Sequence, residues 1–242
     1  MVGIKRLEFE EVITMKDLKL RHELKHHINY LDYVAIKNRL QVVAKQDANV
    51  GEEGTYQIRS LYFDNYQDKA LREKIDGVNK REKFRIRYYN DDFSYIRLEK
   101  KSKMYGLCNK LSTAITKEEC EKLVAGDIEW MRESKQALIL ELYAKMRYQQ
   151  LRPKTIVEYT REPFIYQTGN VRITFDSNVR TGINSKDFFN PKAPTISANA
   201  ENITILEVKY DRFLPEIIEN CIQMRDRKTS AFSKYVACRL YG

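Results

Sequence analysis

The stretch 95–101, Tyr-Ile-Arg-Leu-Glu-Lys-Lys, decides how we interpret the fold, because apolar and charged residues alternate along it. A period of two predicts a β-strand with one apolar and one charged face. The charged face carries Arg97, Glu99 and Lys101. One such strand is ordinarily a surface strand with its charged side chains in solvent. The same alternation recurs in at least four other segments, so the charged faces call for a common explanation.

The other strands and the helices follow from the same kind of pattern. Besides 95–101, the segments predicted as strands are 21–25, 56–64, 83–89, 109–115, 155–161, 170–178 and 203–210. Helical spacing predicts helices at 31–45, 65–75, 116–124, 134–151, 214–224 and 230–241. Thr116 and Glu119 form a capping-box pattern, and that helix can extend past Gly126. Residues 1–20 are expected to cover one end of the fold, and residues 181–202 to form a loop.

The helices decide where the charged strand faces point. Their apolar stripes need an apolar surface, so the apolar strand faces should meet the helices and the charged faces should lie on the other side of the sheet. A sheet that closes on itself puts that side within a barrel. We therefore predict an α+β fold, a closed antiparallel β-barrel (a tunnel) with a charged interior, flanked by helices, as a single domain over residues 1–242. An open sheet with solvated charged faces is the alternative.

The charged faces carry more cations than carboxylates. Their members are Glu23, Lys25, Arg85, Arg87, Arg97, Glu99, Lys101, Lys110, Arg161, Arg172, Asp176, Glu207 and Lys209. Two like charges about 4 Å apart repel by roughly 4 kcal/mol at an effective dielectric of 20, so an enclosed lining of this kind calls for a polyanion. Arginine forks suit phosphate oxygens, and carboxylates suit Mg²⁺ or Mn²⁺. Phosphoryl transfer needs alignment, charge neutralisation and a metal, which this lining offers.

The composition indicates an anionic partner and argues against several classes of protein. The 43 Lys and Arg residues against 34 Asp and Glu residues give a net charge of +9, which fits phosphate compounds, nucleic acid or a membrane surface. The four cysteines lack CxxC spacing, and His22, His26 and His27 are interpreted as non-ligands. There is no Gly-rich phosphate loop. No signal peptide or transmembrane span is recognisable, so a cytoplasmic protein is expected.

Six short motifs occur in an order that resembles VTC domains, the polyphosphate polymerase domains of the triphosphate tunnel metalloenzyme superfamily. They are Arg-His-Glu-Leu-Lys at 21–25, Ser-Leu-Tyr-Phe-Asp-Asn at 60–65, Phe-Arg-Ile-Arg at 84–87, Leu-Glu-Lys-Lys at 98–101, Glu-Val-Lys at 207–209 and Ser-Lys-Tyr at 233–235. The resemblance covers about residues 20 to 240 and lies in the ordered set, because each motif alone is unspecific.

The resemblance implies transfer of the γ-phosphate of ATP onto a growing inorganic polyphosphate chain, with Mn²⁺ or Mg²⁺ and without nucleic acid. The residues expected to act on the phosphates are Lys25, Arg85, Arg87, Lys101, Arg161 and Arg172. Those expected to bind substrate are Lys110, Arg97, Lys209 and Lys234, with Tyr62 lining either the cavity or the core. Glu207 is the expected metal ligand, and Glu99 shares the charged face as a second candidate.

One position departs from the hydrolytic members of the superfamily, which begin with Glu-x-Glu-x-Lys. Arg21 stands where the first Glu would be, and this favours the polymerase branch over a two-metal hydrolase. An inorganic triphosphatase or nucleotide phosphohydrolase on the same fold remains an alternative. A non-catalytic binder of polyphosphate or RNA is another, although the strand aromatics mostly lie opposite the charges, which is unlike a nucleic-acid surface.

Overall fold

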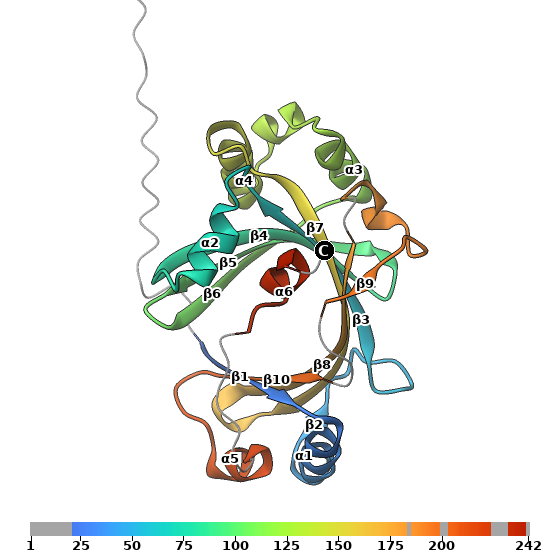
Figure 1. The fold of residues 1–242 in the computed structure, drawn as a ribbon, viewed down its shortest axis with the longest axis vertical. Helices are drawn as coiled ribbons and strands as arrows, with labels where there is room; N and C mark the ends of the chain where they lie inside the picture. Colours follow the sequence, from blue (N-terminus) through green and yellow to red (C-terminus); the bar gives the residue numbers. More distant parts are fainter. Residues whose placement is uncertain (1–20, 183–184, 199–202, 224–231, 241–242) are drawn as a thin grey trace, which may run out of the picture.

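A ten-stranded antiparallel sheet forms the wall of the barrel in the computed structural model, which describes residues 21–182, 185–198, 203–223 and 232–240 (Figure 1). The hydrogen-bonded order of its long strands is β1-β10-β8-β7-β3-β4-β5-β6. Their bounds are β1 (His22–Ile28), β3 (Tyr56–Asp64), β4 (Lys80–Tyr89), β5 (Asp92–Met104), β6 (Leu107–Ala114), β7 (Arg152–Tyr166), β8 (Val171–Gly182) and β10 (Thr204–Tyr210). Short strands β2 (Lys45–Gln46) and β9 (Ile196–Ser197) pair with β7 and β8.

The two edge strands of this sheet, β1 and β6, meet at a single bridge. The backbone N–H of Arg21 donates to the Cys108 carbonyl at 3.2 Å, and the N–H of Cys108 donates back at 3.3 Å. Figure 1 shows β4, β5 and β6 above, β1, β10 and β8 below, and β7 and β3 as the wall that joins them. The predicted antiparallel tunnel barrel is confirmed, with closure by a bridge rather than by a continuous strand ladder.

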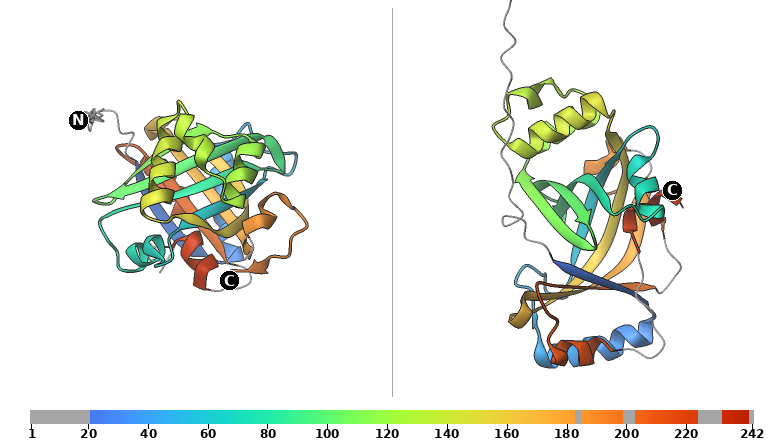
Figure 2. Two further views of the ribbon diagram at one scale, coloured as in Figure 1. Left: turned by 90° about the horizontal axis from the view of Figure 1, so that it is seen from above. Right: turned by 90° about the vertical axis from the view of Figure 1, so that its left-hand side faces the viewer.

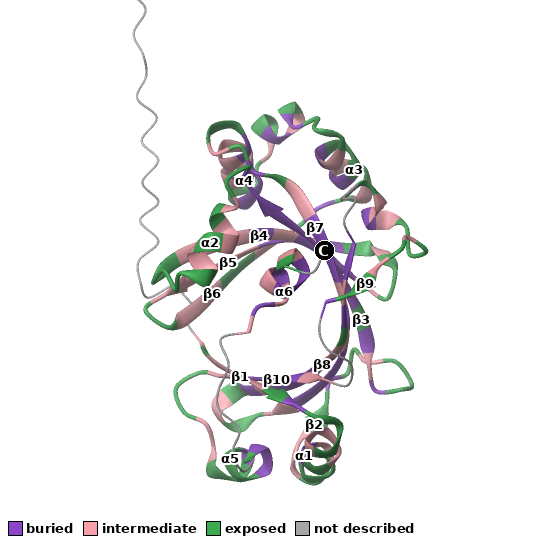
Figure 3. Cartoon of the chain, in the orientation of Figure 1, coloured by how far each residue is buried: buried purple, intermediate pink, exposed green. Residues whose placement is uncertain are grey.

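The apolar strand faces point outward and are covered by helices, as the alternation predicted. On one side Phe84, Ile86, Ile96 and Leu98 pack with α3 (Lys117–Ala125) and α4 (Ala137–Tyr148). On the other side the apolar residues of β8 and β10 pack with α1 (Tyr30–Val43) and α5 (Glu216–Ile222). Figure 3 shows buried segments along the strands and in α3, α4 and α5. Burying the apolar faces this way leaves the charged faces to the interior.

The two ends of the barrel differ. At one end, where β3 ends and β4 begins, lie α2 (Lys69–Ile75) and α6 (Lys234–Leu240), and we call this the helix end. In Figure 1 α6 lies in the barrel opening, and Figure 2 shows it from two further sides. The Tyr235 hydroxyl donates to Asp64 at 2.6 Å, which fixes α6 there. At the other end Asn90 and Asp91, with φ of 48° and 55°, turn β4 into β5, and we call this the hairpin end.

The structure corrects several predicted boundaries. The Thr116 capping box is present, but α3 stops at Ala125 because Gly126 takes φ 91° and ends the helix, and a separate 3₁₀ turn follows at Glu129–Glu133. The predicted loop 181–202 contains a 3₁₀ turn, Ser185–Phe189, in which Phe188 is buried against Tyr88. Residues 1–20 lie outside the described residues. Within the described part of the chain, no helix is long and apolar enough to cross a membrane.

Candidate active site

The charged interior of the barrel contains three carboxylate centres, and each is surrounded by cations. The first is Glu99 on β5, which is almost fully buried. Arg85 donates to it at 2.7 Å, Lys110 lies at 3.0 Å, and Arg87 stands at 4.0 Å. Burial raises the pKa of Glu99, but the three cations outweigh it and hold the pKa well below its usual range. Glu99 is therefore an anion that holds the arginines of β4 in place.

The second centre is a pair of carboxylates, Glu207 on β10 and Glu23 on β1. Lys25 lies 3.2 Å from Glu207 and 3.6 Å from Glu23, and Lys209 lies 2.6 Å and 3.8 Å from the same two groups. Lys101 reaches Glu23 from β5 at 2.8 Å, across the seam of the barrel. Burial and the Glu207 charge raise the pKa of Glu23, but the lysines lower it to about 2. Burial also raises the pKa of Glu207, which its lysines hold well below the usual range.

The third centre is Asp176 on β8, which has no solvent exposure. Arg161 binds it with two hydrogen bonds of 2.6 and 2.8 Å, and Lys234 from α6 lies at 2.5 Å. Both cations also lie on the ring of Tyr159, at 5.3 and 4.6 Å from its centroid. Helix α6 thus contributes a cation to the lining from outside the sheet.

Most residues predicted for the site meet in this network. Lys25, Arg85, Arg87, Lys101, Lys110, Arg161, Lys209 and Lys234 surround the carboxylates, and Tyr62 accepts from Arg85 at 2.8 Å. Two predicted residues lie nearer the hairpin end. Arg97 bonds Ser112 at 3.0 Å, and Arg172 binds Asp47 at 2.6 Å and is about one-third exposed.

The two carboxylates named as metal ligands belong to different centres. Glu99 is bonded to Arg85 and Lys110, whereas Glu207 shares its lysines with Glu23. Among the described residues no group of three or more His, Cys, Asp or Glu side chains could hold a metal ion. A Mg²⁺ or Mn²⁺ ion bound by one or two carboxylates, waters and substrate phosphates still fits the pair of Glu207 and Glu23. Sequence reasoning put Glu23 on the right face without naming it a ligand.

Sequence reasoning missed Lys83, although its spacing from Arg85 and Arg87 puts it on the same face. Lys83 pairs with Lys101 in the strand register, and its ammonium lies 5.2 Å from the Tyr62 ring centroid. Within the described residues no carboxylate lies within ion-pair distance of Lys83. Burial, Lys101, Lys25 and Arg85 lower its pKa to about 8. Ser60, which accepts from Arg87 at 2.9 Å, was also missed as a polar partner, and Tyr159 accepts from Arg87 at 3.0 Å from β7.

The lowered pKa of Lys83 predicts a pH dependence for anion binding. Above about pH 8 the free amine is mostly neutral, and a bound phosphate must restore its proton. If binding takes up one proton, the apparent affinity falls by up to about tenfold for each unit of rising pH. We expect tripolyphosphate affinity to fall more steeply from pH 8 to pH 10 in the wild type than in Lys83→Met. Isothermal titration calorimetry measures the affinity of both proteins at each pH, and the ionisation of tripolyphosphate itself affects both proteins equally. If the affinities of the two proteins fall with the same slope, Lys83 does not bind phosphate.

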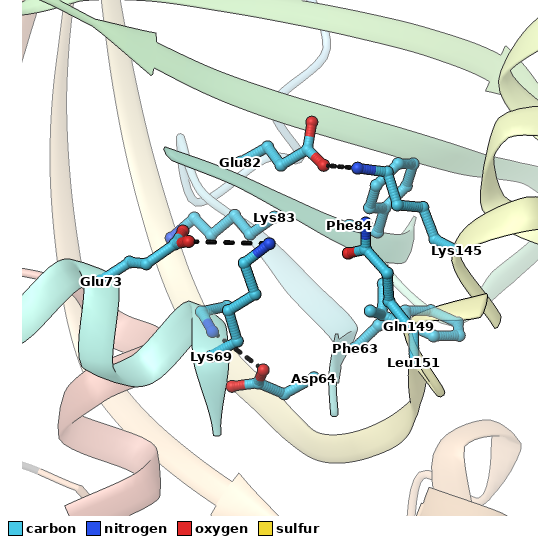
Figure 4. Close-up of a pocket in the computed structure, with 11 residues that line it drawn as sticks. Phe63, Asp64, Lys69, Glu73, Glu82, Lys83, Phe84, Lys145, Gln149 and Leu151 are labelled. Atoms are coloured by element: carbon cyan, nitrogen blue, oxygen red, sulfur yellow. Dashed lines mark hydrogen bonds and ion pairs between the residues drawn. The ribbon is translucent and has the colours of Figure 1, made fainter. Parts of the chain in front are cut away.

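A pocket beside the helix end adjoins the interior network, with which it shares Lys83 (Figure 4). It lies between α2, the start of β4 and the end of α4, and its apolar wall is formed by Phe63, Phe84 and Leu151. Of its three acidic residues, Glu73 and Glu82 are paired with Lys69 and Lys145 of the same pocket, and Asp64 accepts from Tyr235. Because its charges are balanced locally, we do not place the phosphate site there.

The fold and the site define a class of protein: an antiparallel tunnel barrel with an ion-paired, predominantly cationic lining. The chain belongs to the VTC domain family, whose model matches residues 20–241. No protein with a curated description matches the sequence.

Solved structures with a similar course of the chain are distant in sequence. PH1012 protein from Pyrococcus horikoshii OT3 is 13% identical, with 90% of this chain and 98% of that chain covered and a TM-score of 0.47. A candidate adenylate cyclase from Bacillus halodurans is 12% identical, with 84% and 87% covered and a TM-score of 0.46. Both TM-scores lie below 0.5, so the family assignment rests on the VTC match alone.

Proposed function

We propose that this domain is a metal-dependent polyphosphate polymerase, which transfers the γ-phosphate of ATP to the end of a growing inorganic polyphosphate chain in the tunnel. One observation carries the proposal: the tunnel holds buried cations whose donors are not taken up by carboxylates. Arg87 is 5% exposed, and its nearest carboxylate oxygen is 4.0 Å away. Lys83 has the ring of Tyr62 at 5.2 Å and the cations Lys101, Lys25 and Arg85 around it, and none of the ion pairs among the described residues includes it. A chain of phosphates supplies the missing anions.

The lining provides what phosphoryl transfer asks of a protein. Arg85 and Arg87 are held side by side by Glu99, Ser60 and Tyr62, so their guanidinium groups are already oriented before an anion arrives. Glu207 and Glu23 would hold Mn²⁺ or Mg²⁺, which would neutralise charge on the transferring phosphate. The Cys108 thiol contacts Glu23 at 3.7 Å. The proposed reaction needs no protein nucleophile, because its nucleophile is the terminal phosphate oxygen of the acceptor.

The position of Arg21 favours the polymerase over a triphosphatase. Its side chain binds Asp211 at 2.9 Å and does not join the carboxylate pair of Glu23 and Glu207. The pair therefore lacks the further carboxylate that the Glu-x-Glu-x-Lys pattern of the hydrolytic members would add at this position.

An assay of products tests this proposal. With ATP and Mn²⁺ or Mg²⁺, we expect a ladder of polyphosphate, with one ADP released for each phosphate added. Orthophosphate in place of polymer, from ATP or from tripolyphosphate, would identify a hydrolase instead. Tight binding of polyphosphate without turnover under any metal would identify a binding module.

A further inference from the structure

Three tyrosines form a rim at the hairpin end of the tunnel. Tyr89 follows Arg85 and Arg87 along the inner face of β4, Tyr95 precedes Arg97 on β5, and Tyr56 begins β3. The rings of Tyr56 and Tyr89 contact edge to face at 5.7 Å, and those of Tyr89 and Tyr95 lie 6.2 Å apart. Tyr95 is 55% exposed. The rim is a continuous aromatic surface that opens to solvent at Tyr95.

Each tyrosine of this rim is paired with an arginine. The guanidinium carbon of Arg97 lies 5.8 Å from the Tyr95 ring centroid, and that of Arg87 lies 6.0 Å from the Tyr89 ring centroid. Arg172 donates to the Tyr56 hydroxyl at 3.0 Å. Arg87 also extends inward to Ser60 and Tyr159, so the aromatic rim passes directly into the cationic lining. A ligand that lies across this boundary meets flat rings first and forked cations next.

The helix end offers no comparable surface. Its inner tyrosines, Tyr62 and Tyr235, stack on each other at 5.1 Å and are almost fully buried, so neither has a free face. Lys74 of α2 lies close enough to Arg81 and Lys103 that burial and these charges lower its pKa. The exposed ring at this end, Tyr105, has the Lys80 amine over it rather than an arginine. The two ends therefore differ in chemistry: the hairpin end has three contacting rings beside arginines, and the helix end has a ring beside lysines.

We infer that the hairpin end binds the nucleoside of the phosphate donor. The base stacks on Tyr95 and Tyr89, and the triphosphate extends inward to Arg97, Arg87 and Arg85. A base and a phosphate chain are the two halves of a nucleotide, and they match the two halves of this boundary. The inference rests on the proposed function in taking a nucleotide as the donor. Because stacking uses the π-face that every base has, purines are preferred to pyrimidines only by their larger ring.

Equilibrium binding without turnover tests the site. The ligands are a non-hydrolysable ATP analogue and inorganic tripolyphosphate, and the proteins are wild type, Tyr95→Ala, Tyr95→Phe and Tyr105→Ala. Tyr105 is the matched control, because it is an exposed tyrosine with a cation on its ring, at the other end of β5. Thermal melting of each variant verifies that it is folded.

We expect Tyr95→Ala to weaken the binding of the ATP analogue by roughly 5- to 100-fold. The affinity for tripolyphosphate should stay within twofold of that of the wild type. Tyr95→Phe keeps the ring and should bind both ligands with wild-type affinity. Tyr105→Ala should change the affinity for neither ligand. Equal weakening of both ligands, or no weakening of the analogue, overturns the inference. A protein that binds the analogue through Tyr95 but makes no polymer refutes the proposed function and leaves the nucleoside site standing. If Tyr95→Ala makes polymer at the wild-type rate and binds the analogue as the wild type does, the nucleoside site is refuted and the proposed function stands.

Discussion

Glu207→Gln is expected to lower metal-dependent turnover of ATP by about 100-fold or more, since a metal ion supplies several kcal/mol of charge stabilisation in such reactions. The substitution keeps the size of the side chain and removes its charge. Glu207 is 5% exposed and lies between Lys25 and Lys209, so its loss takes away the proposed metal ligand and leaves the two lysines with only their longer contacts to Glu23. Initial rates over a range of Mn²⁺ concentrations measure the effect. Excess metal should recover part of the activity, because Glu23 remains.

Glu162→Gln is the matched control for this substitution. Glu162 is also 5% exposed, but it lies on the outer face of β7, where it binds Lys37 at 2.8 Å and Tyr33 at 2.7 Å. Both variants lose one buried, paired carboxylate, so both should melt at lower temperature than the wild type. Only Glu207→Gln should lose activity beyond what its stability explains. Equal loss in the two variants would mean that Glu207 acts through folding alone.

The period of two predicted which strand face each charged residue occupies, but not its position along the barrel axis. Glu99 and Glu207 share a face by spacing, and the strand register then assigns them to separate centres. Register depends on long-range pairing, which no local pattern contains. The pairing of Glu23 with Glu207 follows from the adjacent register of β1 and β10, in which Lys25 lies opposite Glu207. The roles of Glu207 and Glu99 as metal ligands stay predictions.

The sequence predicted that the barrel closes, but neither the place of closure nor the course of the long loop could be predicted, for a similar reason. The bridge between Arg21 and Cys108 consists of backbone hydrogen bonds, so neither side chain marks it. The segment after β8 looked polar along its length, yet Phe188 lies buried beside Tyr88, whose hydroxyl bonds the Phe188 carbonyl at 2.8 Å. Two adjacent aromatic residues, Phe188 and Phe189, in a polar stretch give no periodicity. By contrast the Thr116 capping box was predictable, because both partners lie within one helical turn.

Arg87→Met is expected to reduce kcat/KM for ATP by roughly 100- to 10,000-fold, because hydrogen bonds to charged groups are worth about 1.5–3 kcal/mol each and a guanidinium can make two to a phosphate. Arg87 suits this test better than its neighbours. Its bonded partners are the neutral Ser60 and Tyr159, and Glu99 keeps Arg85 and Lys110 when Arg87 is removed. The variant therefore loses a phosphate ligand without exposing an unpaired buried carboxylate.

Two further variants give this experiment its controls. Arg59→Met removes an equally buried arginine, 3% exposed, from the outer face of β3, where it binds Glu158 at 2.9 Å, and it should retain activity. Arg87→Lys keeps the charge but not the fork, so we expect it to recover only part of the lost kcat/KM. Steady-state kinetics with ATP at saturating Mn²⁺ compares all three variants with the wild type. If Arg59→Met and Arg87→Met lose activity alike, the interior of the barrel has no special part in the reaction, and the phosphate chain must bind elsewhere.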